Sequence, residues 1–174
     1  MSVHLVRMKT ILLMRHAKAE PGVPGQKDFD RCLAARGDED ALRMGRALAK
    51  LGDVPDAIVS SPAARARQTA EAAARAMKFA GTIRFESALY DAPGDAWLAA
   101  LRALPASVVS VLVVAHSPGI AEVAALLTGA APGAFDVPTG AVIAFDGAVK
   151  RWRELGEGGA SLRWFLRPKL VEQL

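Results

Sequence analysis

The stretches that decide the fold are KTILLM, at residues 9–14, and VVSVLVVA, at residues 108–115. Both are short apolar runs without a helical period, which is typical of buried strands. The first run is followed at once by Arg15 and His16, and the second by His116. Because ligands of an open parallel sheet bind beyond the carboxyl ends of its strands, we expect these three side chains to border one site.

Helices and further strands alternate around these two runs. Helices are predicted at residues 38–51, from 61 to about 77, at 95–104 and from 117 to 127, and strands at 57–60, 82–86, 139–145 and 162–166. Ser61, followed by Pro62, is predicted to cap the second helix. The alternation predicts an α/β fold, a three-layer α/β/α sandwich with a mostly parallel central sheet.

Length and composition predict one domain over residues 1–174, with residues 1–8 as a poorly structured extension and Met8 as an alternative start. Cys32 is the single cysteine, which excludes an internal disulfide and suits a reducing compartment. No run of about 18 apolar residues offers a membrane span, and residues 1–7 lack the apolar core of a secretory signal. We therefore expect a cytoplasmic protein without a membrane partner.

The net charge of +4 suits an anionic partner, but the 22 basic residues form no run of five. The densest basic region contains Lys150, Arg151, Arg153, Arg163, Arg167 and Lys169. No aromatic-basic motif accompanies it, so we expect no nucleic-acid partner.

Four segments resemble, in order and spacing, the motifs of one known family. They are LMRHA at residues 13–17, SSPAARARQTA at 60–70, VAHSPG at 114–119 and PTGA at 138–141. These segments are similar to those of the histidine phosphatase superfamily, and RHAKAE at 15–20 with LYD at 89–91 looks most like the SixA branch of small phosphohistidine phosphatases. The resemblance covers nearly the whole chain and implies a phosphoglycerate mutase-like fold.

The resemblance also implies a role for each matching residue. His16 would be the nucleophile that accepts the phosphoryl group. Arg15 and Arg65 would hold phosphoryl oxygens, which a planar guanidinium can grip in a fork. His116 would donate a hydrogen bond to the same oxygens, with a positive charge on its ring as a further option, and the Ser117 amide would lie near a helix N-terminus, which favours anions.

Several further residues keep two interpretations each. Asp91 matches the carboxylic acid that supplies a proton to the leaving group, but it is equally consistent with a cap for the helix after Pro93. Lys18 either attracts phosphate as a substrate-binding residue or is a solvated loop lysine. Asp28 and Arg31 match an aspartate-x-x-arginine segment of the family and are predicted to form an ion pair at the pocket rim, with substrate contact by Arg31 as the alternative. Tyr90 could line the pocket or belong to the core.

Other phosphatase chemistries do not fit. A cysteine phosphatase needs an arginine six residues after its thiolate, but Asp38 occupies that position after Cys32. The aspartate pair in Asp28-Phe29-Asp30 follows a Pro/Gly-rich loop and not an apolar strand. No glycine-lysine-serine/threonine phosphate loop and no clustered His/Cys/Asp set occurs, so we expect no metal and no cofactor.

The sequence therefore predicts a metal-independent phosphatase that works through a covalent phosphohistidine on His16. Its substrate would be a phosphohistidine-bearing protein, with a small phosphate ester as the alternative. A non-catalytic phosphate- or phosphoprotein-binding module is the alternative of another class. The chain has little length for insertions over the site, so we favour hydrolysis over mutase activity and expect a shallow, open pocket.

Overall fold

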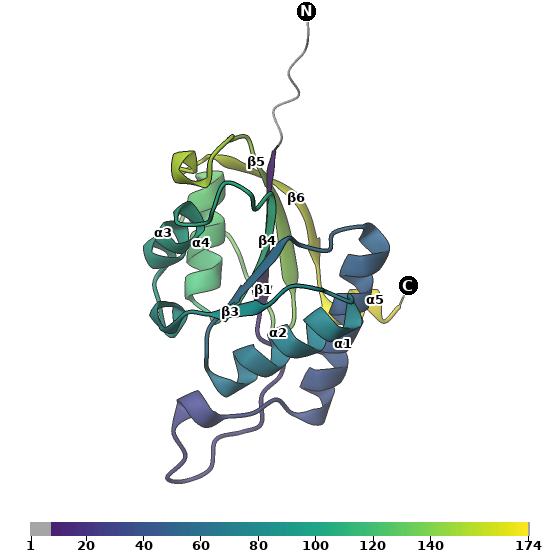
Figure 1. Cartoon of the computed structure of the whole chain (residues 1–174). Helices are drawn as coiled ribbons and strands as arrows, with labels where there is room; N and C mark the ends of the chain where they lie inside the picture. Colours follow the sequence, from purple (N-terminus) through teal and green to yellow (C-terminus); the bar gives the residue numbers. More distant parts are fainter. Residues whose placement is uncertain (1–7, 174) are drawn as a thin grey trace, which may run out of the picture.

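The computed structural model, described over residues 8–173, is built on a six-stranded sheet with the order β3-β2-β4-β1-β5-β6 (Figure 1). The strands are β1 (Lys9–Arg15), β2 (Ala57–Ser60), β3 (Ile83–Phe85), β4 (Ser110–Ala115), β5 (Val142–Gly147) and β6 (Ala160–Leu166). Strands β1 to β4 pair in parallel, whereas β5 is antiparallel to both β1 and β6. The predicted mostly parallel sheet is confirmed. Residues 1–7 of the expected extension lie outside the described residues.

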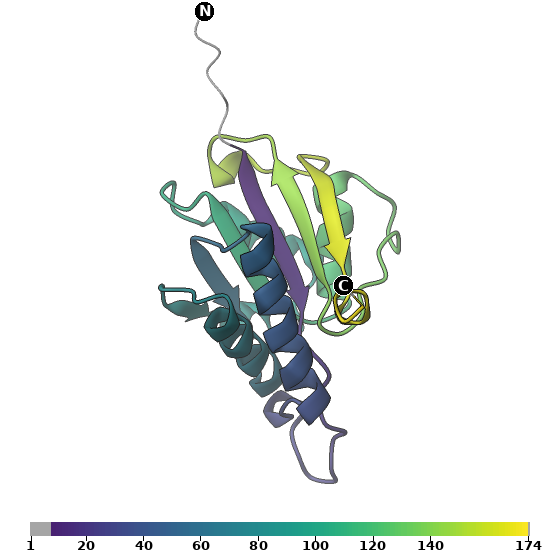
Figure 2. The same cartoon turned by 90° about the vertical axis from the view of Figure 1, so that its right-hand side faces the viewer.

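Helices cover both faces of the sheet. The helices are α1 (Ala35–Leu51), α2 (Ala64–Ala76), α3 (Gly94–Arg102), α4 (Gly119–Thr128) and α5 (Pro168–Val171), with 3-10 turns η1 (Asp28–Asp30), η2 (Ser87–Leu89) and η3 (Trp152–Glu154). Helix α1 packs against α2 and α5 on one face, and α3 packs against α4 and η3 on the other (Figures 1 and 2). This arrangement confirms the three-layer sandwich.

Alternate residues of the central strands supply two separate cores. Ile11 and Leu13 of β1 pack with the α3 and α4 side chains, whereas Leu12 and Met14 pack with those of α1 and α2. All four are fully buried. Because successive strand side chains point to opposite faces, a strand covered on both sides must be apolar throughout. This explains why the central strands appear in the sequence as uninterrupted apolar runs.

Strand register brings the two histidine segments together. Arg15 is paired with Ala115 in the parallel β1–β4 ladder, and the His16 amide donates to the Ala115 carbonyl at 2.8 Å. Gly140 closes the turn before β5, and its amide donates to the carbonyls of Arg15 and His16 at 3.1 Å each. Its φ of 77° is one that glycine adopts without strain. The predicted strand 139–145 therefore begins only at Val142.

Two predicted helix starts were wrong. Helix α1 begins at Ala35 and not at Asp38. Helix α2 has Ala63 as its N-cap, without a side-chain cap hydrogen bond. Ser61, the predicted cap, is fully buried, and its hydroxyl lies 2.8 Å from a ring nitrogen of His116. The serine side chain faces the histidine, and the helix begins after it.

Candidate active site

His16 lies just beyond the end of β1 and is 9% exposed. Its Nδ1 is 2.8 Å from the carbonyl oxygen of Ala17. A carbonyl can only accept a hydrogen bond, so Nδ1 carries the proton and the lone pair of the neutral ring resides on Nε2. Arg65 Nε donates to this Nε2 at 3.3 Å. The backbone thus fixes which nitrogen of His16 can act as a nucleophile.

Arg65 comes from the first turn of α2 and is held on its other side by Asp28 of η1. Its two terminal nitrogens donate to Asp28, NH1 to the carbonyl oxygen at 2.6 Å and NH2 to Oδ2 at 2.8 Å. Asp28 also forms the predicted ion pair with Arg31, at 2.8 Å. The predicted ion pair is confirmed, and the structure adds Arg65 to it.

His116 follows β4 and lies beside His16, with the two ring centroids 5.2 Å apart. It is 5% exposed. Its Nε2 is 2.8 Å from the Ser61 hydroxyl, and the Tyr90 ring meets it edge-on at a centroid distance of 5.6 Å. Ser61 and Tyr90 therefore fix the orientation of the second imidazole.

Two buried polar atoms at this edge of the sheet point to an anionic ligand. Among the described residues, only Arg15 Nε and His116 Nδ1 are buried side-chain nitrogen or oxygen atoms without a hydrogen-bond partner. Arg15 is fixed by a hydrogen bond from NH1 to the Val137 carbonyl at 2.8 Å. Buried polar groups nearly always have a hydrogen-bond partner. Two nitrogens without one, at the carboxyl ends of neighbouring strands, therefore fit a site where a bound oxyanion accepts their hydrogen bonds.

Burial and neighbouring cations keep both histidines neutral. Burial lowers the pKa of His16 to about 3, with His116, Arg65 and Arg15 adding to the decrease. Burial, together with Arg65 and Arg15, likewise lowers the pKa of His116 to about 4. At pH 7 the positive charge at the site therefore resides on the two guanidinium groups, and the His16 Nε2 carries an unprotonated lone pair that accepts only the hydrogen bond from Arg65.

Asp91 lies on the rim of a pocket of about 150 Å³ that also contacts His116 and Trp97. It is exposed and has a φ of 50°. Helix α3 has no side-chain cap from Asp91, because its N-cap is Pro93 and its first amide, that of Gly94, bonds to Glu122 at 2.9 Å. The helix-cap interpretation of Asp91 was wrong, and its role as proton donor stays a prediction.

The two predicted substrate-binding residues lie at the periphery. Lys18 is exposed, two residues after His16. Ser117 is exposed on the rim of the 150 Å³ pocket. Helix α4 begins at Gly119, so the Ser117 amide precedes its first turn. Their contact with substrate stays a prediction.

Three residues support the site through contacts that the sequence did not predict. Two of them, Ser61 and Asp28, are described above. The third is Thr69 of α2, whose hydroxyl accepts a hydrogen bond from the Ala17 amide at 3.0 Å and donates one to the Arg65 carbonyl at 2.7 Å. Thr69 thereby links the turn after His16 to the helix that carries Arg65. Ser61 and Thr69 stand within the motif at 60–70, but nothing in a serine or a threonine indicates which distant group it contacts.

Comparison with known proteins now identifies the family. The family model described as "Histidine phosphatase superfamily (branch 1)" matches residues 11–98. An uncharacterized protein of Mycobacterium leprae is 34% identical over 119 residues, 67% of this chain and 71% of that protein. The chain belongs to the histidine phosphatase superfamily. It is accordingly a phosphatase, and the prediction of a phosphatase is confirmed.

Solved structures in this superfamily share the fold. The assigned phosphohistidine phosphatase SixA of Nakamurella multipartitia has a TM-score of 0.80 and 30% identity, and the match covers 92% of this chain and 96% of that one. Its counterpart from Agrobacterium tumefaciens has a TM-score of 0.78 and 31% identity, covering 92% and 98%. A SixA structure with tungstate matches at 24% identity and a TM-score of 0.79, covering 93% and 99%; this last likeness concerns the fold alone. The predicted SixA-like branch is confirmed.

The part of the chain that the structure describes has two further properties relevant to function. It contains no group of three or more His, Cys, Asp or Glu side chains that could hold a metal ion. Within residues 8–173, no helix has the length and apolar character needed to cross a membrane.

Proposed function

We propose that this phosphatase works without a metal and transfers the phosphoryl group of its substrate to Nε2 of His16. The observation that carries the proposal is the fixed state of that imidazole. Nδ1 donates to the Ala17 carbonyl, and the lowered pKa keeps the ring neutral at pH 7. A neutral imidazole whose lone pair faces an anion site is a competent nucleophile for phosphoryl transfer.

The reaction takes place in two steps. In the first, the hydrogen bond from Arg65 Nε to His16 Nε2 breaks, the Nε2 lone pair attacks phosphorus, an N–P bond forms, and the bond to the leaving group breaks with its electron pair, after which the departing atom takes a proton. Arg15, Arg65 and the ring N–H of His116 hold the three equatorial oxygens, whose negative charge must be stabilised. In the second step a water molecule attacks phosphorus, the N–P bond breaks, and free phosphate leaves while the ring regains its lone pair.

We further infer that the leaving group is the imidazole of a phosphohistidine carried by a protein. The SixA relatives support this substrate class by their names. The pocket beside His116 has about 150 Å³, and a cavity of that size holds a single benzene-sized ring. Asp91, Ser117 and Pro118 are exposed on its rim. A side chain presented by another protein could enter such a pocket, and the exposed Lys18 could attract its phosphate.

The test measures phosphate release from a phosphohistidine protein and from an aryl phosphate, with EDTA present throughout. Wild type, His16→Ala and His4→Ala are compared, the last as a histidine control from outside the described residues. We expect release by wild type and His4→Ala, faster on phosphohistidine, and none by His16→Ala. A quenched reaction should contain an acid-labile, base-stable phosphoenzyme on His16 only.

Asp91→Asn extends the same assay to the leaving group. An alkoxide or phenolate needs a proton as it departs, whereas an imidazole is a better leaving group. The rate of phosphate release by this variant should therefore fall by about 10²-fold or more on the aryl ester and by far less on phosphohistidine. Turnover that survives His16→Ala would refute the mechanism. Turnover of esters alone would assign the enzyme to small phosphate esters.

A further inference from the structure

We propose that Asp28 is a positioning residue for this reaction, because one carboxylate orients the groups that contact both histidines. The proposal rests on the proposed function, in which Arg65 holds the phosphoryl group beside His16. Asp28 lies in η1, far along the chain from α2 and from η2. It forms no hydrogen bond with either histidine, although its charge raises the pKa of His116 slightly against the effect of burial; its hydrogen bonds at the site go to Arg65 and Tyr90.

The first connection runs through Arg65. Its NH1 and NH2 both donate to Asp28, one to the main-chain carbonyl and one to the carboxylate, at 2.6 and 2.8 Å. A planar guanidinium held at both terminal nitrogens cannot rotate freely, so its Nε–H is directed at His16 Nε2, and one further N–H on each terminal nitrogen remains for an oxyanion. The Arg65 side chain is 7% exposed, whereas that of Asp28 is 50% exposed. The buried cation is therefore held from the surface side.

The second connection runs through Tyr90. Its hydroxyl donates to the same Oδ2 of Asp28 at 3.2 Å, and its ring meets His116 edge-on. Phe29, the neighbour of Asp28, also meets the Tyr90 ring edge-on, with centroids 5.1 Å apart. One carboxylate oxygen thus links an arginine at His16 with an aromatic ring at His116.

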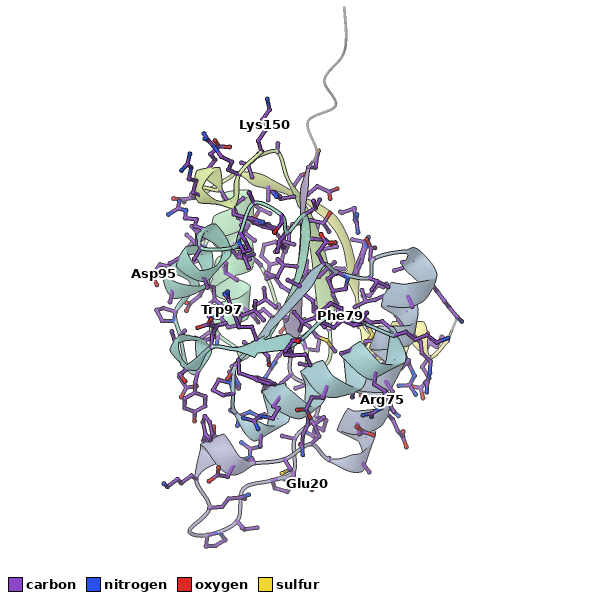
Figure 3. The ribbon with its side chains drawn as sticks, viewed as in Figure 1. Glu20, Arg75, Phe79, Asp95, Trp97 and Lys150 are labelled. Atoms are coloured by element: carbon purple, nitrogen blue, oxygen red, sulfur yellow. The ribbon has the colours of Figure 1, made fainter. Side chains whose placement is uncertain are left out.

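Asp28 is itself fixed by the loop between β1 and α1. Arg31 NH1 donates to Oδ1, while its Nε and NH2 donate to the carbonyl oxygen of Glu20 at 3.1 and 2.9 Å. Figure 3 shows Glu20 on this loop, beyond the carboxyl end of the sheet. The hydrogen bond from Arg31, followed by those from Arg65 and Tyr90, lowers the pKa of Asp28 to about 2. The carboxylate is therefore ionised, and it only accepts hydrogen bonds at pH 7.

The experiment compares Asp28→Asn with Asp30→Asn, whose carboxylate stands in the same 3-10 turn and makes no side-chain hydrogen bond or ion pair within the described residues. We expect Asp28→Asn to lower kcat by about 10- to 100-fold, because a catalytic cation displaced by a fraction of an ångström loses much of its effect in the transition state. KM should change less. Asp30→Asn should behave as wild type.

A double-mutant cycle with Arg65→Lys separates positioning from a general structural effect. If Asp28 acts through Arg65, adding Asp28→Asn to the Arg65→Lys variant should lower kcat by less than about 3-fold further, since the effects of coupled residues are not additive. Independent, multiplicative losses would overturn the proposal. So would a wild-type kcat in Asp28→Asn. Thermal unfolding of each variant checks that the fold is retained.

Tungstate binding, measured by calorimetry, tests the same arrangement without turnover. Asp28→Asn should bind the oxyanion more weakly than Asp30→Asn. Equal binding by the two variants would overturn the positioning role even if wild type showed no His16-dependent turnover. That absence of turnover would by itself refute only the mechanism, so failure of the two proposals can be told apart.

Discussion

At the scale of single residues, the site combines two permanent cations with two imidazoles that burial keeps neutral. Arg15 and Arg65 supply the charge, and burial lowers the pKa even of Arg15. Because the pKa values of His16 and His116 are lowered, both imidazoles are neutral at pH 7, so neither the nucleophile nor the hydrogen-bond donor is one of the charged groups. The positive charge that attracts the substrate therefore does not require a protonated His16, whose Nε2 stays unprotonated at pH 7.

Arg65→Lys tests whether the shape of the cation matters. An ammonium cannot donate to the Asp28 carbonyl, the Asp28 carboxylate and His16 in one plane, as the guanidinium does. We expect turnover to fall by about 10²- to 10³-fold, the effect of losing one preorganised donor. Steady-state kinetics would measure it.

The matched control is Arg67→Lys, on the same helix. Arg67 is exposed, and its guanidinium lies 4.8 Å from the centre of the Phe85 ring. This variant should retain wild-type turnover. An equal loss in both variants would mean that α2 tolerates no lysine in this turn and that the shape argument fails.

At the scale of elements, the ends of β1 and β4 and the first turn of α2 converge because the helices pack closely. Gly45 of α1 faces α2, and a Cβ on it would lie 2.5 Å from the Ala73 carbonyl oxygen and 2.8 Å from the Ala76 Cβ. Helix α2 carries Arg65 at its start. The approach of α1 to α2 therefore helps set the distance between Arg65 and the end of the sheet.

Gly45→Ala tests this close approach. In an exposed helix the change would stabilise by up to about 1 kcal/mol. Here the new methyl meets backbone, so we expect the free energy of unfolding to fall by about 1–3 kcal/mol. Urea unfolding would measure the change. A variant more stable than wild type would contradict the prediction, because it would show that α1 and α2 can move apart to admit the methyl group without loss of stability.

At the scale of the whole molecule, the distribution of basic residues argues against a single polyanion-binding face. Lys150 and Arg151 precede β6, and Arg167 and Lys169 follow it, at opposite ends of a strand about 20 Å long. Lys150 lies at the end of the molecule away from Glu20 and the site (Figure 3). Arg151 is paired with Glu154. The positive net charge is therefore dispersed.

Folding of the whole chain should be linked to pH through the two site histidines. Their pKa values in the folded state, about 3 and about 4, lie below the ordinary value of 6.5. The unfolded chain therefore binds more protons below pH 6.5, and stability decreases as pH falls from there toward the folded values. We expect each histidine to lower the free energy of unfolding by about 2 kcal/mol between pH 7 and pH 5.

His16→Gln removes one of these contributions. Its free energy of unfolding should fall between pH 7 and pH 5 by about 2 kcal/mol less than that of wild type. Urea unfolding at the two pH values measures the difference. An unchanged pH dependence would mean that His16 titrates alike in the folded and unfolded chain.

The sequence by itself determined the layered α/β fold and the pair of histidines after two strands. An uninterrupted apolar run indicates a strand that is buried on both faces. The carboxyl ends of neighbouring parallel strands lie at the same end of the sheet, so the residues that follow them lie close together. The resemblance to the histidine phosphatases added Arg65, which the alanine-rich sequence of its helix does not single out. Helix starts were predicted less well, because α1 and α2 begin without the side-chain caps that mark such boundaries in a sequence.

Only the tertiary structure decided how the site is supported. Ser61 was expected to cap a helix, but its hydroxyl lies against His116 and, among the backbone amides of the described residues, accepts only that of the N-cap residue Ala63. Asp28 was expected to pair with Arg31 and also holds Arg65. The contacts with His116 and Arg65 join segments far apart in the chain, and the polarity of a side chain does not specify its distant partner. The tautomer of His16 likewise depends on where a backbone carbonyl comes to lie. Local patterns determine which residues reach the site, and packing determines what each one touches there.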